Sequence, residues 1–144
     1  MYRWILDTNI IISGLFWSGK ENKLLELAVA EEYKAIICEF VLQETKRVIE
    51  NKFPEMENKA EVSLNLLVKS AKVQPLLPAQ ELNQFIYNWN LDIELSKGDM
   101  IILATAANSE AEAIITGDQD FHKSEIKEII EIISADQALQ KLDR

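Results

Sequence analysis

The stretch YRWILDTNIIISG (residues 2–14) joins two apolar segments through three small polar residues, Asp7, Thr8 and Asn9. The run 2–6 has the length and continuous apolar character of a buried strand. A carboxylate, a hydroxyl and an amide between two buried segments form either an Asx turn or one wall of a binding site. In an open parallel sheet, ligands bind beyond the carboxyl ends of the strands, and Asp7 directly follows such an end.

Short apolar runs alternate with amphipathic helical patterns along the rest of the chain. Further strands are expected at 34–38, 112–116 and 127–134, with a short Pro-interrupted edge segment at 72–77. Helices are expected at 20–33, 41–53, 56–71, 79–91, 98–110 and 135–143. The helix at 98–110 is apolar on every side, which is typical of a buried helix. This alternation predicts an α/β fold whose mainly parallel sheet is covered on both faces.

Composition narrows the class of protein without deciding its function. The chain has 144 residues, 48% of them hydrophobic, and shows no repeat or linker, so we expect one domain over residues 1–144. No apolar run reaches the roughly 18 residues of a membrane helix and no signal-peptide pattern opens the chain, so a cytoplasmic protein is expected. The single cysteine, Cys38, excludes an internal disulfide. A net charge of −9 argues against nonspecific binding to polyanions, yet fits carboxylates that await divalent cations.

Acidic residues from four separate segments map to the same edge of the predicted sheet. Asp7 follows the first strand, and Asp118 and Asp120 follow the strand at 112–116. Asp99 opens the buried helix, and Glu44 lies in the first turn of the helix after strand 34–38. Because the carboxyl ends of parallel strands meet at one edge, we expect these side chains to lie close together.

Each acid also has a simpler explanation. Asp7 with Asn9 fits an Asx turn, and Ser96 with Asp99 has the spacing of a helix capping box. Glu44 fits a solvated residue that favours the helix dipole, and Asp118 and Asp120 fit ordinary turn chemistry beside Gly117. Under these simpler explanations, all five acids would lie at one edge of the sheet by chance. A shared binding site explains their common position better.

Clustered carboxylates repel each other and take up protons unless cations neutralise them. Oxygen ligands without His or Cys favour hard ions such as Mg²⁺ or Mn²⁺. Two such ions suit phosphodiester hydrolysis, in which one activates water and the other stabilises the leaving oxygen. The residues themselves therefore indicate metal-dependent phosphoryl chemistry.

With these residues assembled, the chain resembles the PIN-domain nucleases, including the VapC-like toxin ribonucleases of toxin–antitoxin pairs. Three motifs carry the resemblance in order, namely ILDTNIIIS (5–13), FVLQETKRVI (40–49) and DMIILATAANSEAEAIITGDQDF (99–121). The ordered set is more specific than any one motif. It implies a PIN-like three-layer α/β/α fold and a Mg²⁺- or Mn²⁺-dependent ribonuclease that cleaves single-stranded RNA. It also implies a small antitoxin protein as partner.

The same resemblance assigns roles by position. It makes Asp7, Glu44, Asp99 and Asp118 the catalytic, metal-binding acids, with Asp120 as an auxiliary acidic position. Thr116 and Asn9 match polar positions that orient these carboxylates, as outer residues of metal sites do. The stretch CEFVLQE (38–44) departs from the family by placing Glu39 and Phe40 where a small polar residue is common.

Two other classes of protein fit the sequence less well. An aspartyl-nucleophile phosphatase needs a second Asp two residues after the first, and position 9 is Asn. A response-regulator receiver needs paired acids at the first strand and a phosphoacceptor at the third, which the chain lacks. A housekeeping PIN nuclease and a non-catalytic PIN-fold module stay open. Aromatic residues in 15–21 and 85–90 are either core edges or a surface for a partner or a homodimer.

Overall fold

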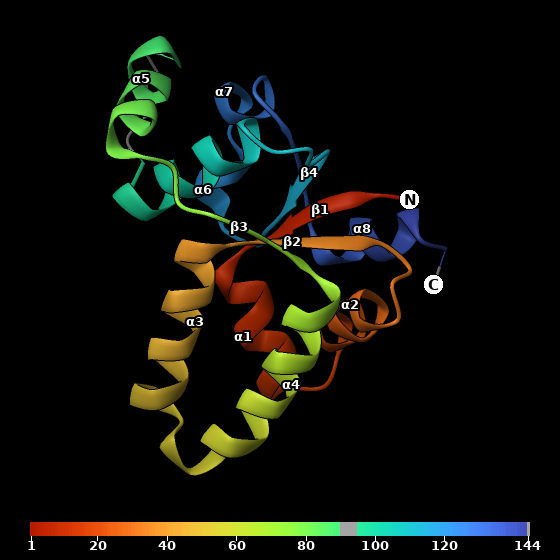
Figure 1. Ribbon diagram of the computed structural model, residues 1–144. Helices are drawn as coiled ribbons and strands as arrows, with labels where there is room; N and C mark the ends of the chain where they lie inside the picture. The colour runs from red at the N-terminus through yellow and green to blue at the C-terminus, as the bar shows by residue number, and fades with distance from the viewer. Residues whose placement is uncertain (90–94, 144) are drawn as a thin grey trace.

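Five strands form one parallel sheet in the order β3-β2-β1-β4-β5. The structure is a computed structural model that describes residues 1–89 and 95–143. The strands are β1 (Arg3–Leu6), β2 (Lys34–Cys38), β3 (Lys72–Gln74), β4 (Ala113–Ile115) and β5 (Glu131–Ile133). From β1 the chain builds outward through β2 to β3, and then crosses to β4 and β5 on the other side (Figure 1). The carboxyl ends of β1 and β4 therefore form a topological switch point.

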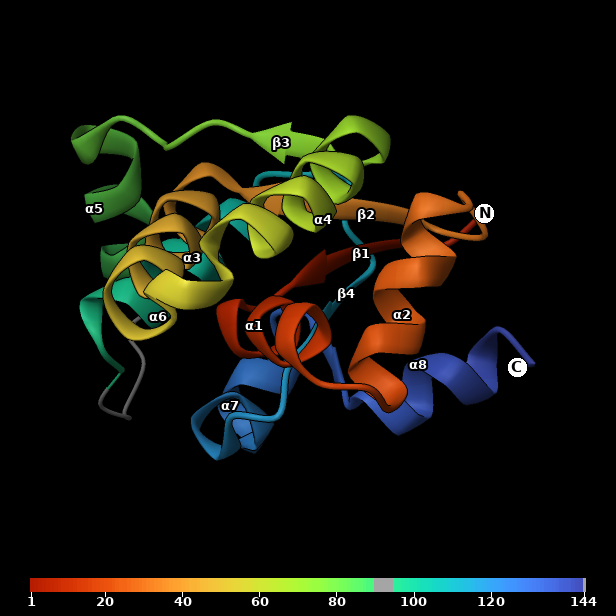
Figure 2. The same ribbon diagram turned by 90° about the horizontal axis from the view of Figure 1, so that it is seen from below.

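Helices cover both faces of the sheet, as expected for a three-layer α/β/α arrangement. The α-helices are α1 (Thr8–Phe16), α2 (Lys20–Val29), α3 (Glu39–Lys52), α4 (Glu57–Ser70), α5 (Ala79–Trp89), α6 (Lys97–Ala107), α7 (Ser124–Lys127) and α8 (Ala135–Lys141). Two 3₁₀ turns, η1 (Pro54–Met56) and η2 (Gln119–His122), complete the described elements. Helices α1 to α4 pack against one another, while α6 contacts α3 and α5 (Figures 1 and 2).

The strands are continuous apolar runs in the sequence because they lie in the hydrophobic core. Trp4, Ile5 and Leu6 of β1 have at most 1% of their surface exposed, because helices cover both faces of the central strand. Ile5 lies in register with Ile36 of β2 and Ile114 of β4. Cys38 is buried at the end of β2, as the sequence indicates. In the described part of the chain, no helix is both long and apolar enough to cross a membrane.

The polar triplet after β1 begins a helix, which the sequence pattern did not identify. Asp7 is the N-cap of α1, and its side chain accepts a hydrogen bond from the backbone N–H of Thr8. The β-branched run Ile10–Ile12 has weak helix propensity, so its packing against α2, α3 and α4 determines the local structure.

The predicted strand at 127–134 was wrong in its first half. Residues 124–127 form α7, and the backbone N–H groups of Lys127 and Glu128 donate to the carbonyl oxygens of Lys123 and Ser124. Only Glu131–Ile133 pairs with β4. A run of isoleucines without strict alternation does not separate a strand from a buried turn of helix.

Other boundaries moved by a few residues. The helix predicted at 20–33 ends at Val29, and Glu31 takes a positive φ of 59° just beyond it. The helix at 56–71 runs from 57 to 70 behind η1, and the edge segment at 72–77 contributes β3 over 72–74. Residues 90–91 of the helix predicted at 79–91 lie outside the described residues.

Of the four aromatic residues considered as a surface, two pack against the core and two are exposed. Phe16 and Trp89 are partly buried on the core, whereas Trp17 and Tyr87 are 57% and 84% exposed.

Candidate metal centre

The predicted acids gather at the switch point of the sheet. Asp7 directly follows β1, and Asp118 lies three residues beyond the end of β4. Asp99 is in the first turn of α6, and Glu44 is in the second turn of α3, which begins at the carboxyl end of β2. The topology therefore brings together side chains that are up to 111 positions apart, from Asp7 to Asp118.

Asp7 is the most buried of these acids, at 6% exposure, and both of its carboxylate oxygens are held. Oδ1 accepts the backbone N–H of Thr8 at 2.8 Å, and Oδ2 accepts the hydroxyl of Thr116 at 2.7 Å. The Thr116 hydroxyl in turn accepts the backbone N–H of Asp118 at 3.0 Å. Thr116 thus fixes Asp7 and the start of the Asp118 turn with one side chain.

Thr8 connects the first acid to the second. Its hydroxyl donates to Glu44 Oε1 at 2.6 Å, while its backbone N–H holds Asp7. Thr8 is 7% exposed, so this contact is largely shielded from water. This role of Thr8 is not visible in the sequence, because Thr8 and Glu44 are 36 positions apart.

Asp99, Asp118 and Asp120 form a second group beside Asp7. One carboxylate oxygen from each lies within 4.8 Å of the others, the separation that a shared cation needs. The backbone N–H of Asp120 donates to Asp118 Oδ1 at 2.9 Å, and that of Asp99 donates to the Ser96 hydroxyl at 3.1 Å. Ser96 is therefore an N-cap of α6, and this capping places Asp99 at the site instead of competing with it.

Burial and mutual repulsion shift the titration of two acids. The pKa of Asp99 is raised to about 6, chiefly by burial and also by the negative charges of Asp118, Asp7 and Asp120, against the opposing hydrogen bond with Ser96. Burial also raises the pKa of Asp7, opposed by its hydrogen bonds to Thr116 and Thr8 and reinforced by Asp118 and Glu44. The all-oxygen donor set and this unfavourable charge fit a divalent cation.

Asn9 and Glu39, which are named from the sequence, differ in their contacts, as does His122 of η2. Asn9 is exposed, and within residues 1–89 and 95–143 it forms no hydrogen bond with the acids, so its supporting role stays a prediction. Glu39 accepts the backbone N–H of Leu76 at 3.3 Å and thereby holds the segment after β3. His122 Nε2 lies 3.0 Å from the Thr116 carbonyl oxygen, a contact that needs the proton on Nε2.

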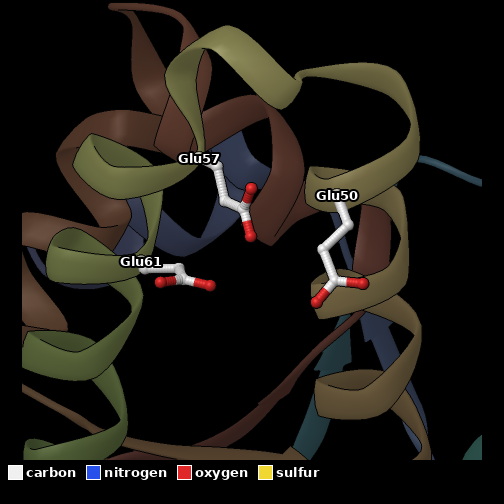
Figure 3. Close-up of side chains that lie close together, drawn as sticks. All are labelled: Glu50, Glu57 and Glu61. Carbon is white, nitrogen blue, oxygen red and sulfur yellow. The ribbon is translucent and has the colours of Figure 1, made fainter.

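A separate acidic group lies on the hairpin of α3 and α4. Figure 3 shows the side chains of Glu57 and Glu61 on α4 facing Glu50 on α3. Their carboxylate oxygens also lie within 4.8 Å, but Glu50 and Glu61 are exposed and no hydroxyl holds the group among the described residues. Glu50 follows Glu44 by six positions, about 9 Å along the helix. These residues serve below as matched controls.

Comparison with known proteins identifies the family. The PIN domain family model matches residues 4–127, so the chain belongs to the PIN domain family. The resemblance drawn from the three sequence motifs is confirmed. None of the curated proteins searched matches the chain.

Solved structures share the fold at low sequence identity. The VapBC2 structure from Rickettsia felis, bound to a promoter DNA fragment, matches with a TM-score of 0.64 and 17% identity over 92% of this chain and 98% of that one. Mycobacterium tuberculosis VapC20, described as a sarcin-ricin loop cleaving toxin, matches with a TM-score of 0.59 and 16% identity over 83% of this chain and 92% of that one. PAE2754 from Pyrobaculum aerophilum matches with a TM-score of 0.67 and 14% identity over 99% of this chain and 90% of that one. Together they confirm the PIN-like α/β/α fold.

The raised pKa values predict that the metal-free protein loses stability as pH rises. Between the unfolded value of 3.8 and the folded value of about 6, the folded state holds a proton on Asp99 that the unfolded state has released. The free energy of unfolding in EDTA should therefore fall from pH 4.5 to 6.5 through this group. Urea unfolding of wild-type and Asp99→Asn protein should show a shallower fall in the variant. Glu50→Gln is the control, and equal pH dependence in Asp99→Asn and wild type would contradict the prediction.

Proposed function

We propose that the protein is a Mg²⁺- or Mn²⁺-dependent endoribonuclease that cleaves phosphodiester bonds of single-stranded RNA by two-metal-type hydrolysis. The observation that carries this proposal is the convergence of Asp7, Glu44, Asp99 and Asp118 at the switch point of a PIN fold. Membership of a family of nucleases supports the reaction class. The described residues at the site are acids and threonines, a set that suits a metal-assisted attack by water better than a covalent route.

The roles follow from the contacts of each side chain. Asp7, Glu44, Asp99 and Asp118 would hold the cations, with Asp120 as an additional ligand beside Asp118. Divalent ions bound there supply the Lewis acidity that phosphodiester hydrolysis needs. Thr116 fixes the carboxylate of Asp7, and Thr8 fixes that of Glu44, so neither acid must be reordered when a cation arrives.

We propose further that the protein is the toxin of a toxin–antitoxin pair, acts in the cytoplasm and is blocked by a small antitoxin protein. Two structures with this fold are VapBC complexes bound to DNA, and a third is a FitAB complex bound to DNA. One neighbour is described as a toxin that cleaves the sarcin-ricin loop. We also propose that two copies of the protein associate into a homodimer. A housekeeping PIN nuclease and a non-catalytic RNA-binding module are the alternatives that the experiments below separate.

Asp7→Asn and Asp99→Asn should each abolish cleavage of single-stranded RNA in Mg²⁺ or Mn²⁺ while the fold is retained. Each change removes a carboxylate from the proposed cation ligands and keeps the side-chain size. Cleavage is followed on labelled RNA, and folding by circular dichroism. Glu50→Gln, which removes an acid from the separate group of Figure 3, should cleave at the wild-type rate. A wild-type protein that cuts no RNA in either metal would overturn the enzyme proposal.

Thr8→Val should weaken the binding of divalent metal by about 10–100-fold, the usual effect of removing a residue that orients a ligand. Valine keeps the shape of threonine but cannot donate to Glu44. The measurement is the rise in melting temperature across a Mn²⁺ titration, since a ligand that binds only the folded state stabilises it. Thr45→Val is the matched control, because it removes a hydroxyl that donates to the Val41 carbonyl oxygen of its own helix. Equal Mn²⁺ titrations for Thr8→Val and wild type would remove Thr8 from the site.

Expression of the chain alone should stop the growth of a bacterial host, and co-expression of an adjacent small reading frame should restore it. Asp7→Asn is the control for toxicity that depends on the acids. Equal growth with and without the chain would contradict the toxin assignment but leave a housekeeping nuclease in place.

A further inference from the structure

Two ion pairs lie in different parts of the acidic cluster. Arg47 Nη2 lies 3.9 Å from Glu44 Oε2, and Lys123 Nζ lies 3.8 Å from Asp120 Oδ1. Glu44 is held by the Thr8 hydroxyl, whereas Asp120 belongs to the group that it forms with Asp99 and Asp118. The proposed metal centre therefore has one cationic side chain at its Glu44 end and one at its Asp120 end.

Neither ion pair stabilises the fold enough to explain why Arg47 and Lys123 occupy these positions. The Arg47 side chain is 70% exposed and that of Lys123 is 41% exposed, and both contacts are long. Exposed pairs of this kind contribute little to the stability of a fold. Within the described residues the guanidinium of Arg47 forms no hydrogen bond, so its donors are available to a ligand.

The surface beside Arg47 has the composition of a nucleotide subsite. Phe40, Gln43, Glu44 and Arg47 line a depression of about 180 Å³ on the exposed side of α3. A partly buried aromatic ring offers a face on which a base can stack, and a guanidinium binds phosphate oxygens in pairs. The volume lies below the range of about 300 Å³ and upward that encloses a whole small-molecule ligand, so the depression suits one base of a strand better than an entire ligand.

The neighbouring acids and cations explain how a protein with a net charge of −9 could bind RNA at this site. Without metal, Glu44 and Asp120 neutralise the two cations and the cluster repels phosphate. When divalent ions take up the charge of the acids, Arg47 and Lys123 are left to pair with phosphate oxygens. The affinity for RNA then arises at the site and not from the overall charge.

We propose that a single RNA strand crosses the acidic cluster between Arg47 and Lys123, which bind the phosphates on either side of the bond to be cut. This inference rests on the proposed function, because it assigns the path of its substrate. Arg47 occupies the end with the Phe40 depression, and Lys123 the end formed by η2.

The test measures binding and cleavage separately. Binding of fluorescein-labelled single-stranded RNA with phosphorothioate linkages, which resist hydrolysis, is followed by anisotropy in Mn²⁺, so that the acids stay intact while the RNA is not consumed. Adding Arg47→Gln should weaken binding about tenfold or more, the usual loss for a charge-assisted hydrogen bond. It should also reduce the slope of log affinity against log salt by about 0.7, the value for one phosphate of a single strand. Lys123→Gln should act in the same way, and Arg47→Lys should restore most of the slope.

Lys46→Gln and Lys127→Gln are the matched controls. Each removes one positive charge from an exposed position near Arg47 or Lys123 and should leave affinity and slope unchanged. In the cleaving protein, Arg47→Gln should raise KM with kcat nearly unchanged, whereas a role in positioning Glu44 would lower kcat. Affinity and slope equal to those of the controls, or a loss confined to kcat, would overturn the inference. If Arg47-dependent binding is found but wild-type protein cleaves no RNA, the nuclease proposal fails and the path of the strand stands.

Discussion

The structure depends on how two threonine hydroxyls hold two acids in a place where carboxylates repel each other. Asp7 is buried at the switch point and surrounded by the negative charges of Asp118 and Glu44. Thr116 donates to Asp7 and lowers its pKa against the effect of burial, and Thr8 donates to Glu44. The two hydroxyls therefore hold one oxygen of each carboxylate in a defined position at the carboxyl end of the sheet.

The sheet topology makes this crowding unavoidable. Because all five strands are parallel, every strand ends at the same edge, and the reversal of order between β1 and β4 opens a gap there. Asp7 and Asp118 come from the two strands that border this gap, while α3 and α6 bring Glu44 and Asp99 to it. The apolar strands are buried on both faces, so the edge cannot relax by local fraying. The core thereby holds the repulsive arrangement in place.

Much of this arrangement follows from the sequence, and the rest depends on contacts between distant positions. Continuous apolar runs locate the strands, and the acids that follow them can be assigned to one edge from the rule for parallel sheets alone. The helix after Asp7 is not visible in the pattern, because Ile10–Ile12 favours strand and only tertiary packing makes it helical. The role of Thr8 is hidden for a similar reason, since its partner Glu44 lies on another element. Residues 127–130 were misassigned because a short isoleucine-rich run fits either a strand or a buried turn.

The distribution of charge at the site limits what kind of substrate it can accept. The acids alone would repel a polyanion such as RNA. Under the proposed function, divalent cations would reverse this field locally, next to Arg47 and Lys123, which pair with Glu44 and Asp120. The proposed path would then need metal at the centre and phosphates at both sides, a condition that a free mononucleotide would meet only in part. This requirement favours the proposed cleavage within a chain over hydrolysis of small phosphate esters.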